Sequence, residues 1–383
     1  MERRQLGRTD IVASVLGFGG SEIGYQSVSA RTVARLLGSA LDAGLNVIDT
    51  AECYDDSESL IGKALGARRR DVALFTKCGH AGGWSSADWR RAPLLASIER
   101  SLRRLATDHV DLIQLHSCSL GELRRGEAIE ALERARERGW ARYIGYSGDG
   151  EAARYAVECG RFDTLQTSVS IADQDAVDRT VPLAIARKMG VIAKRPLANV
   201  VWSYERKPSE TYYQAYWSRL RKLDYPFLKA APDTAVSTAL RFTLRVPGVH
   251  TAIVGTTKPE RWQQNAALLE VGQRANGRVL QHHDLPGPGV LLRAREDSVT
   301  ALFVLLDEVV VGVEEMVLAA TDHGRVLGTG LGHLQLERDA ASLGDVPQNR
   351  IPELRGQRRA SPDDDPEQEG LILRPARRSE RDD

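Results

Sequence analysis

Short runs of hydrophobic residues recur along the chain as far as about residue 255, and each run ends in small or polar residues. The runs are nearly continuously apolar instead of alternating, which is typical of parallel strands that are covered on both faces. We predict eight strands, over residues 15–20, 46–50, 72–77, 110–116, 143–147, 164–168, 191–194 and 251–255.

Helical patterns fill the stretches between these runs. The spacing of apolar residues predicts helices over residues 30–43, 57–65, 93–105, 120–138, 180–188 and 259–269. Ser57 is the expected N-cap of the second helix, and Gly44 and Gly66 are suited to the position after a helix end. Strands that alternate with helices form parallel βαβ units. Eight such units predict an α/β fold, a closed (β/α)8 TIM barrel, with an open doubly wound sheet as the alternative.

The two ends of the chain depart from this repeat. Residues 3–6 and 11–13 are predicted to form a short N-terminal hairpin around Gly7-Arg8-Thr9-Asp10, which could plug the bottom of the barrel. Residues 271–383 contain no lysine, and the alternation of strands and helices stops there. We therefore predict a barrel domain over residues 1–270 and an atypical C-terminal extension over 271–383, disordered beyond residue 348. The extension is either a fused module or the product of a change in reading frame.

A long insertion, residues 202–232, separates the seventh and eighth units. Its aromatic residues are Trp202, Tyr204, Tyr212, Tyr213, Tyr216, Trp217 and Tyr225. Long loops in compact domains are usually functional, and an aromatic loop at the catalytic end of a barrel suits an apolar substrate wall. The alternative is a packed helical excursion with ordinary core aromatics.

Composition narrows the class of protein. The chain has 383 residues, enough for one large barrel with an appendage, and its formal net charge is zero. That balance argues against binding to nucleic acid or to an acidic membrane surface. No signal sequence, membrane span or metal-type cysteine spacing is visible, so we expect a soluble, reduced, cytoplasmic protein. Cys53, Cys78 and Cys118 lie near strand ends, where small packing residues are favoured over a redox or metal role.

Four polar residues of complementary type follow consecutive predicted strands. Asp49 closes the second strand, Lys77 the third and His116 the fourth, while Tyr54 lies in the loop just past Asp49. Because the C-terminal ends of barrel strands meet at one mouth, we expect the four side chains to converge there. Each alone has a structural explanation, as a capping carboxylate, a rim aromatic, a solvated lysine or a buried histidine.

Together the four residues fit proton transfer to a carbonyl group. A carbonyl that accepts a hydride must also gain a proton, which Tyr54 could supply. The ammonium of Lys77 is expected to lower the pKa of that phenol, and Asp49 to hold Lys77 in place. His116 could donate a hydrogen bond to the carbonyl oxygen and stabilise developing alkoxide charge.

These residues lie in motifs that resemble those of the aldo-keto reductase family. Residues 49–54 (DTAECY) with 57–62 (SESLIG) look like its second-strand signature, 75–77 (FTK) its third and 112–116 (LIQLH) its fourth. Residues 16–20 (LGFGG), with Gly19 and Gly20, match the turn after the first strand. The resemblance covers about residues 3–270. It implies a (β/α)8 barrel, NADPH bound at the C-terminal mouth with NADH possible, and the roles above for Asp49, Tyr54, Lys77 and His116.

The resemblance also suggests which residues hold the cofactor. Residues 253–265 (IVGTTKPERWQQN) are similar to the segment that binds the adenosine phosphate. There the amides of Gly255, Thr256 and Thr257 suit a phosphate at a helix N-terminus. In the same segment, Arg261 would clamp the adenine end, and Gln264 and Asn265 would bind adenine. Many relatives have lysine at the position of Gly255 and glutamate at that of Gln264.

Two departures from the family pattern concern the nicotinamide end. Gly148 stands where the family usually has asparagine, which leaves Ser147 and Gln166 to bind the carboxamide. Lys194 stands where an aromatic residue often stacks on the ring. Lys194 and Arg195 could instead reach the pyrophosphate, or they could be solvated charges at a strand end.

The resemblance predicts an oxidoreductase that reduces an aldehyde or ketone, a small-molecule carbonyl substrate, by hydride transfer from NAD(P)H, an NADP(H)-dependent aldo/keto reductase. Two other classes remain. One is a non-catalytic, cofactor-sensing subunit on the same fold, as in potassium channels, or a C-terminally altered copy with impaired activity. The other is a barrel enzyme that transfers protons without a nicotinamide, such as an isomerase, against which the segment from Arg261 to Asn265 argues.

Overall fold

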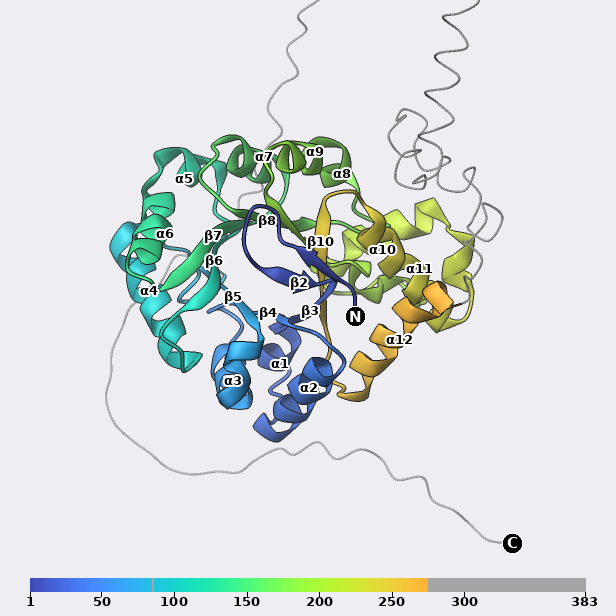
Figure 1. Cartoon of the computed structure of the whole chain (residues 1–383). Helices are drawn as coiled ribbons and strands as arrows, with labels where there is room; N and C mark the ends of the chain where they lie inside the picture. Colours follow the sequence, from blue (N-terminus) through green and yellow to red (C-terminus); the bar gives the residue numbers. More distant parts are fainter. Residues whose placement is uncertain (85, 275–383) are drawn as a thin grey trace, which may run out of the picture. The chain divides into compact units, whose positions relative to one another are not determined.

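The computed structural model describes residues 1–84 and 86–274, and within them eight parallel strands close into a barrel. Around the barrel the order is β10-β3-β4-β5-β6-β7-β8-β9 (Figure 1). The strands are β3 (Leu16–Gly19), β4 (Val47–Asp49), β5 (Ala73–Cys78), β6 (Val110–His116), β7 (Ala141–Ser147), β8 (Thr164–Ser168), β9 (Gly190–Lys194) and β10 (Val249–Gly255). Every predicted strand is confirmed to within a few residues, and the open-sheet alternative is excluded.

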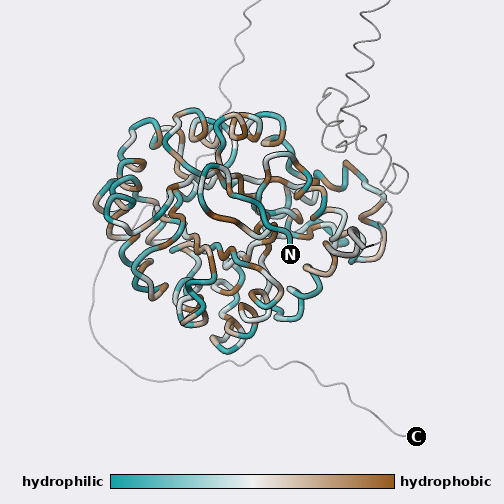
Figure 2. The backbone as a smooth tube through the Cα atoms, in the orientation of Figure 1, coloured by the Kyte–Doolittle hydropathy of each residue, from teal (hydrophilic) through white to brown (hydrophobic). Residues whose placement is uncertain are grey.

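Helices surround the strands in a ring (Figure 1). They are α1 (Ser21–Tyr25), α2 (Ala30–Asp42), α3 (Ser57–Leu65), α4 (Arg91–Arg104), α5 (Leu120–Arg125), α6 (Glu127–Glu137), α7 (Gly150–Glu158), α8 (Asp175–Arg179), α9 (Val181–Ala186), α10 (Thr211–Leu223), α11 (Pro232–Arg245) and α12 (Glu260–Arg274). Short 3-10 helices are η1 (Gly66–Asp71), η2 (Ala198–Ser203) and η3 (Pro226–Lys229). Hydrophobic stretches follow the strands and the inward sides of the helices (Figure 2).

Two helix predictions need correction. The helix expected over residues 120–138 is divided into α5 and α6 at Gly126, whose φ of 83° is left-handed and interrupts the helix. Ser57 is the first residue of α3 and not its N-cap, which is Asp56. The Ser57 hydroxyl instead donates to the carbonyl oxygen of Gly20 at 2.7 Å, and so ties α3 to the turn after β3.

The N-terminal hairpin pairs β1 (Arg3–Gln5) with β2 (Val12–Ser14), as predicted, and lies across one end of the barrel (Figure 1). Its buried residues Leu6, Ile11 and Ala13 pack among side chains of β4, β5, β6, β9 and β10. The hairpin therefore plugs the bottom of the barrel, the end at which the strands begin.

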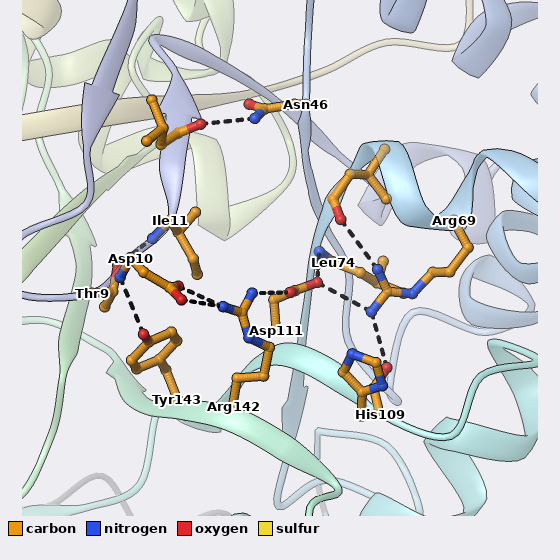
Figure 3. A network of polar contacts seen from close by, with 12 residues as sticks. Thr9, Asp10, Ile11, Asn46, Arg69, Leu74, His109, Asp111, Arg142 and Tyr143 are labelled. Carbon is orange, nitrogen blue, oxygen red and sulfur yellow. Dashed lines mark hydrogen bonds and ion pairs between the residues drawn. The ribbon is translucent and has the colours of Figure 1, made fainter.

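A network of ion pairs and hydrogen bonds holds the hairpin against the bottom of the barrel (Figure 3). Arg142 Nη2 donates to the Asp10 carboxylate at 2.5 Å, and Arg142 Nη1 donates to Asp111 Oδ1 at 2.8 Å. Asp111 is buried, accepts from the amide of Leu74 at 2.8 Å and forms an ion pair with Arg69 at 3.1 Å. A buried carboxylate needs several such donors to offset its desolvation.

The insertion over residues 202–232 is largely helical, formed by the end of η2, by α10 and by η3. Tyr216 and Tyr225 are buried in a cluster with Leu220 and Ala239. Tyr204 and Tyr212 are exposed. The packed helical excursion therefore describes much of the segment, while Tyr212 faces Arg195, its hydroxyl accepting from Nε at 2.5 Å.

The predicted C-terminal extension lies almost entirely outside the described residues, because α12 ends at Arg274. The predicted disorder beyond residue 348 also lies outside them. In the described part of the chain, no helix has the length and apolar character that crossing a membrane requires.

Candidate active site

The four residues predicted to form a proton-transfer site lie together at the C-terminal end of the barrel. Asp49 is the last residue of β4 and His116 the last of β6, and Lys77 lies near the end of β5. Since β4, β5 and β6 are neighbours, their ends share one edge. Tyr54 follows β4, and its ring stands edge-on to that of His116 with the centroids 5.6 Å apart.

Asp49 and Lys77 form a buried ion pair. Lys77 Nζ lies 2.5 Å from Asp49 Oδ2 and donates to the carbonyl oxygen of Thr50 at 2.8 Å. The other carboxylate oxygen, Oδ1, accepts from the amides of Gln166 at 3.0 Å and Gln114 at 3.3 Å. Both charges are thus hydrogen-bonded, as buried charges must be if the pair is not to destabilise the fold.

The electrostatic state of Tyr54 differs from the sequence-based prediction. Lys77 Nζ lies 5.2 Å from the centre of the Tyr54 ring. Burial nevertheless raises the pKa of Tyr54 well above its usual range, and the Asp49 carboxylate acts in the same direction. The expected lowering of this pKa by Lys77 is therefore wrong: loss of hydration dominates, and Asp49 offsets the ammonium. The phenol remains protonated at neutral pH.

His116 is neutral for the same reason. Burial lowers the pKa of His116 well below its usual range, and the nearby charge of Lys77 lowers it further. A neutral imidazole carries one ring proton, so one ring nitrogen donates and the other accepts. Nδ1 lies 3.5 Å from the sulfur of Cys53.

Aromatic residues that sequence reasoning missed surround Tyr54 and His116. The Tyr25 and Tyr54 centroids are 5.6 Å apart, and those of Trp84 and His116 are 4.6 Å apart. Trp84 Nε1 donates to the Tyr25 hydroxyl at 3.1 Å, which links the two. His80 lies beside Trp84 with centroids 4.6 Å apart. The sequence could have indicated these residues by their position, since each follows the end of a barrel strand.

Glu52 fixes the loop that carries His80. Its buried carboxylate accepts from the backbone amides of Gly79 and His80 at 2.7 and 2.9 Å. It also accepts from the Ser97 hydroxyl and, at 3.2 Å, from Arg100. Glu52, which lies within the DTAECY motif, therefore holds the loop after β5 against the site.

Ser147 and Gln166, predicted to bind a carboxamide, lie next to the buried ion pair. The Ser147 hydroxyl donates to Gln166 Oε1 at 2.8 Å, and Gln166 Nε2 donates to Asp49. Both side chains are buried, Ser147 at the end of β7 and Gln166 in the middle of β8. The structure thus brings these two residues together with the quartet.

Lys194 and Arg195 are neither solvated nor free. Lys194 Nζ lies 2.8 Å from Asp149 Oδ2, and Arg195 pairs with the same oxygen at 3.4 Å while donating to Ser168 Oγ at 2.7 Å. Burial acts to raise the pKa of Asp149, but Lys194 and Arg195 outweigh it and hold that pKa below its usual range. Asp149, which sequence reasoning missed, thus pairs with both cations.

Two glycines predicted to bind the cofactor, Gly19 and Gly255, meet where β3 and β10 end side by side. Gly19 is paired with Gly255 in the sheet. The amide of Gly20 donates to the carbonyl oxygen of Asp49 at 2.8 Å, so this turn adjoins the quartet. A Cβ on Gly255 would collide with the carboxylate of Glu22, which occupies the space of a side chain there.

The remaining predicted cofactor residues lie on the segment from Gly255 into α12. Thr256 and Thr257 lie between β10 and α12, and the hydroxyl of Thr256 accepts from the amide of Lys258 at 3.2 Å. On α12, Gln264 is exposed, Arg261 is partly buried and Asn265 is buried. The described residues include no cluster of histidine, cysteine and carboxylate side chains that could hold a metal ion.

A closed (β/α)8 barrel with a polar site at the C-terminal ends of its strands is the architecture of a barrel enzyme. The family model for "Aldo/keto reductase family" matches residues 15–275, and the chain belongs to that family. It is thus an aldo/keto reductase family oxidoreductase, from a family that uses NAD(P)H.

Comparisons with individual proteins support this family assignment. An uncharacterised oxidoreductase, YqkF of Bacillus subtilis, is 28% identical over 74% of this chain and 94% of its own length. A probable voltage-gated potassium channel subunit beta of Arabidopsis thaliana is 25% identical over 71% of this chain and 92% of its own. The solved holo form of the aldo-keto reductase AKR11C1 from Bacillus halodurans is 27% identical with a TM-score of 0.64, covering 77% of this chain and 96% of that one.

Proposed function

We propose that the protein reduces an aldehyde or ketone, with Tyr54 as the proton donor and NAD(P)H as the source of hydride. The observation that carries the proposal is the convergence of a neutral phenol, a neutral imidazole and the buried Lys77–Asp49 pair at the mouth of the barrel.

Each residue has a defined part in the proposed reaction. A nicotinamide bound in the mouth would supply the hydride that the carbonyl carbon accepts. Tyr54 gives its phenolic proton to the carbonyl oxygen, and the Lys77 ammonium stabilises the phenolate that remains. Asp49 holds Lys77 in position. His116 donates a hydrogen bond to the same oxygen and so orients the carbonyl.

The residues of the mouth fit a dinucleotide of this kind. Ser147 and Gln166 offer a hydroxyl and an amide beside the quartet, where the carboxamide would lie. The amides of Gly255, Thr256 and Thr257 precede α12, where a phosphate is favoured. Arg261, Gln264 and Asn265 follow on α12 for the adenine end. We propose NADPH as the preferred form, as the resemblance implies.

Replacing Tyr54 tests this proposal directly. Tyr54→Phe keeps the ring and loses the proton, so turnover should fall by at least about a hundredfold, the usual contribution of a general acid. Cofactor binding, followed by fluorescence titration with NADPH and NADH, should be unchanged. Full activity in this variant would contradict the assignment, and failure of the native protein to bind either nucleotide would remove the reductase function.

A second candidate is a cofactor-sensing subunit, favoured by the similarity to the potassium channel subunit. It predicts tight nucleotide binding with very slow oxidation of NADPH across aldehydes, ketones and sugars. Rapid turnover of any of these would exclude it.

We also propose that the chain consists of a barrel domain over residues 1–270 and a separate extension over 271–383. Comparing carbonyl reduction by the full chain and by a chain ending at Arg274 tests whether the extension impairs activity. We place the protein in the cytoplasm, consistent with four free cysteines among the described residues.

A further inference from the structure

Cys53 lies directly before Tyr54, and its sulfur faces the imidazole of His116. Sγ is 3.5 Å from Nδ1, a hydrogen-bonding distance for sulfur. The side chain is buried, with 9% of its surface exposed. The contact joins two different elements, since Cys53 follows β4 and His116 ends β6. It therefore depends on the folded barrel and bears on the chemistry of the site.

The direction of this hydrogen bond follows from the protonation of its partners. Burial raises the pKa of the Cys53 thiol to about 12, so the sulfur keeps its proton. His116 is neutral, with one protonated and one unprotonated ring nitrogen. An imidazole nitrogen is a good acceptor, whereas thiol sulfur is a weak one. The favourable arrangement is therefore S–H donating to Nδ1, which leaves the ring proton on Nε2.

Other groups around the ring do not compete for Nδ1. The charged or titratable groups near His116 include Lys77, His80, Lys194 and Arg195, and the Tyr54 ring stands edge-on to it. Lys77 is bonded to Asp49, and the other two cations to Asp149. His80 Nε2 lies 2.7 Å from the main-chain oxygen of His116. A carbonyl oxygen only accepts, so His80 donates there and leaves the ring nitrogens alone.

We propose that Cys53 is a positioning residue, whose thiol donates to Nδ1 of His116 and so keeps the ring proton on Nε2, ready for a substrate carbonyl oxygen. The proposal rests on the proposed function, because it concerns the same site. In the opposite tautomer Nε2 would present a lone pair to the carbonyl oxygen, and two lone pairs repel each other. Cys53, which precedes the proton donor Tyr54, would thus set the tautomer of His116, the second residue that bonds to the carbonyl oxygen.

Nitrogen-15 NMR of the full-length protein, labelled at histidine, reads the tautomer without any turnover. We expect the His116 signals, assigned by loss in a His116→Gln variant, to show an unprotonated Nδ1 and a protonated Nε2. In Cys53→Ala the two nitrogens should move toward the averaged shifts of exchanging tautomers. In Cys53→Ser, where a hydroxyl can donate in the same direction, the native pattern should persist. A protonated Nδ1 in the native protein would overturn the proposal.

Kinetics provides a second readout. A hydrogen bond of ordinary strength is at stake, so Cys53→Ala should lower kcat for a carbonyl substrate roughly threefold to tenfold. KM should change little, because the bond from Nε2 strengthens as charge develops on the oxygen. Cys53→Ser should recover most of the loss. Equal losses in Ala and Ser variants, with the tautomer unchanged in both, would show that Cys53 is only a packing residue.

Cys118 provides a matched control, because it is a buried thiol two residues after His116 and, within the described part of the chain, makes no hydrogen bond to that ring. Cys118→Ala should leave both the NMR pattern and kcat unchanged. Absence of carbonyl reduction by the native protein would refute the proposed function, whereas the tautomer measured by NMR tests Cys53 by itself.

Discussion

Tyr54 and His116 sit in a setting that disfavours charge on either ring. Burial raises the pKa of the phenol and lowers that of the imidazole, so both are neutral over the same pH interval. Two neutral donors can share one carbonyl oxygen without repelling each other. The charges of the site lie in the buried pair of Lys77 and Asp49.

This state predicts how reduction depends on pH. The donor must be protonated, so activity is lost as pH rises through the pKa of Tyr54, which burial places above about 10. His116 stays neutral at and above about pH 6.5, because burial lowers its pKa well below that usual value. We expect kcat for carbonyl reduction to be flat from about pH 7 to 9. An inflection within that interval would mean that Lys77 outweighs burial, as the sequence alone suggested.

Sequence reasoning found the quartet because each member closes or follows a recognisable strand. It could not find the contact from Cys53 to His116 or the role of Asp149. Both depend on which way a side chain turns in a loop after a strand, and on partners from other strands. Strand periodicity does not determine those directions.

At the scale of elements, the strands were predictable because their interior and exterior faces are both apolar, which leaves an unbroken signal. The division of α5 from α6 was not, because Gly126 fits an apolar helical repeat and its left-handed φ is a property of the fold. For the insertion the sequence left a helical excursion and a functional loop as alternatives, since α10 mixes buried Tyr216 with exposed Tyr212.

The contact of Glu22 in α1 with Gly255 in β10 predicts an effect on the preference for NADPH over NADH. The carboxylate of Glu22 occupies the space beside Gly255, at the segment expected to hold a phosphate. Glu22→Gln removes a like charge there and should tighten NADPH binding roughly fivefold, more than NADH binding. Arg261→Ala should act in the opposite direction. Fluorescence titration measures both, and an unchanged ratio of the two Kd values in Glu22→Gln would reject the effect.

At the scale of the whole molecule, Asp111 joins several segments at the bottom of the barrel through its contacts with Arg69, Leu74 and Arg142. Asp111→Ala leaves Arg69, Arg142 and the amide of Leu74 without their shared acceptor, so we expect a loss of about 3 kcal/mol of stability. That loss corresponds to a fall in Tm of roughly 6 °C by calorimetry or circular dichroism.

Asp42→Ala, which removes an exposed partner of Arg68, is the control and should shift Tm by less than about 1 °C. Nucleotide binding should survive both changes, since both lie away from the mouth. Equal Tm values for the two variants would show that the network adds little.

The hairpin at the bottom of the barrel has a consequence for how the chain is made. Its residues are synthesised before the strands that they pack against, since Asp10 pairs with Arg142, 132 positions further along the chain. The amide of Arg8 donates to the carbonyl oxygen of Lys188, which is synthesised later still. The apolar surfaces of Leu6 and Ile11 therefore stay uncovered until most of the strands that pack against them have been synthesised. We therefore expect the hairpin to pack into the bottom of the barrel only after β9 and β10, which supply Ile192 and Ile253, have been synthesised.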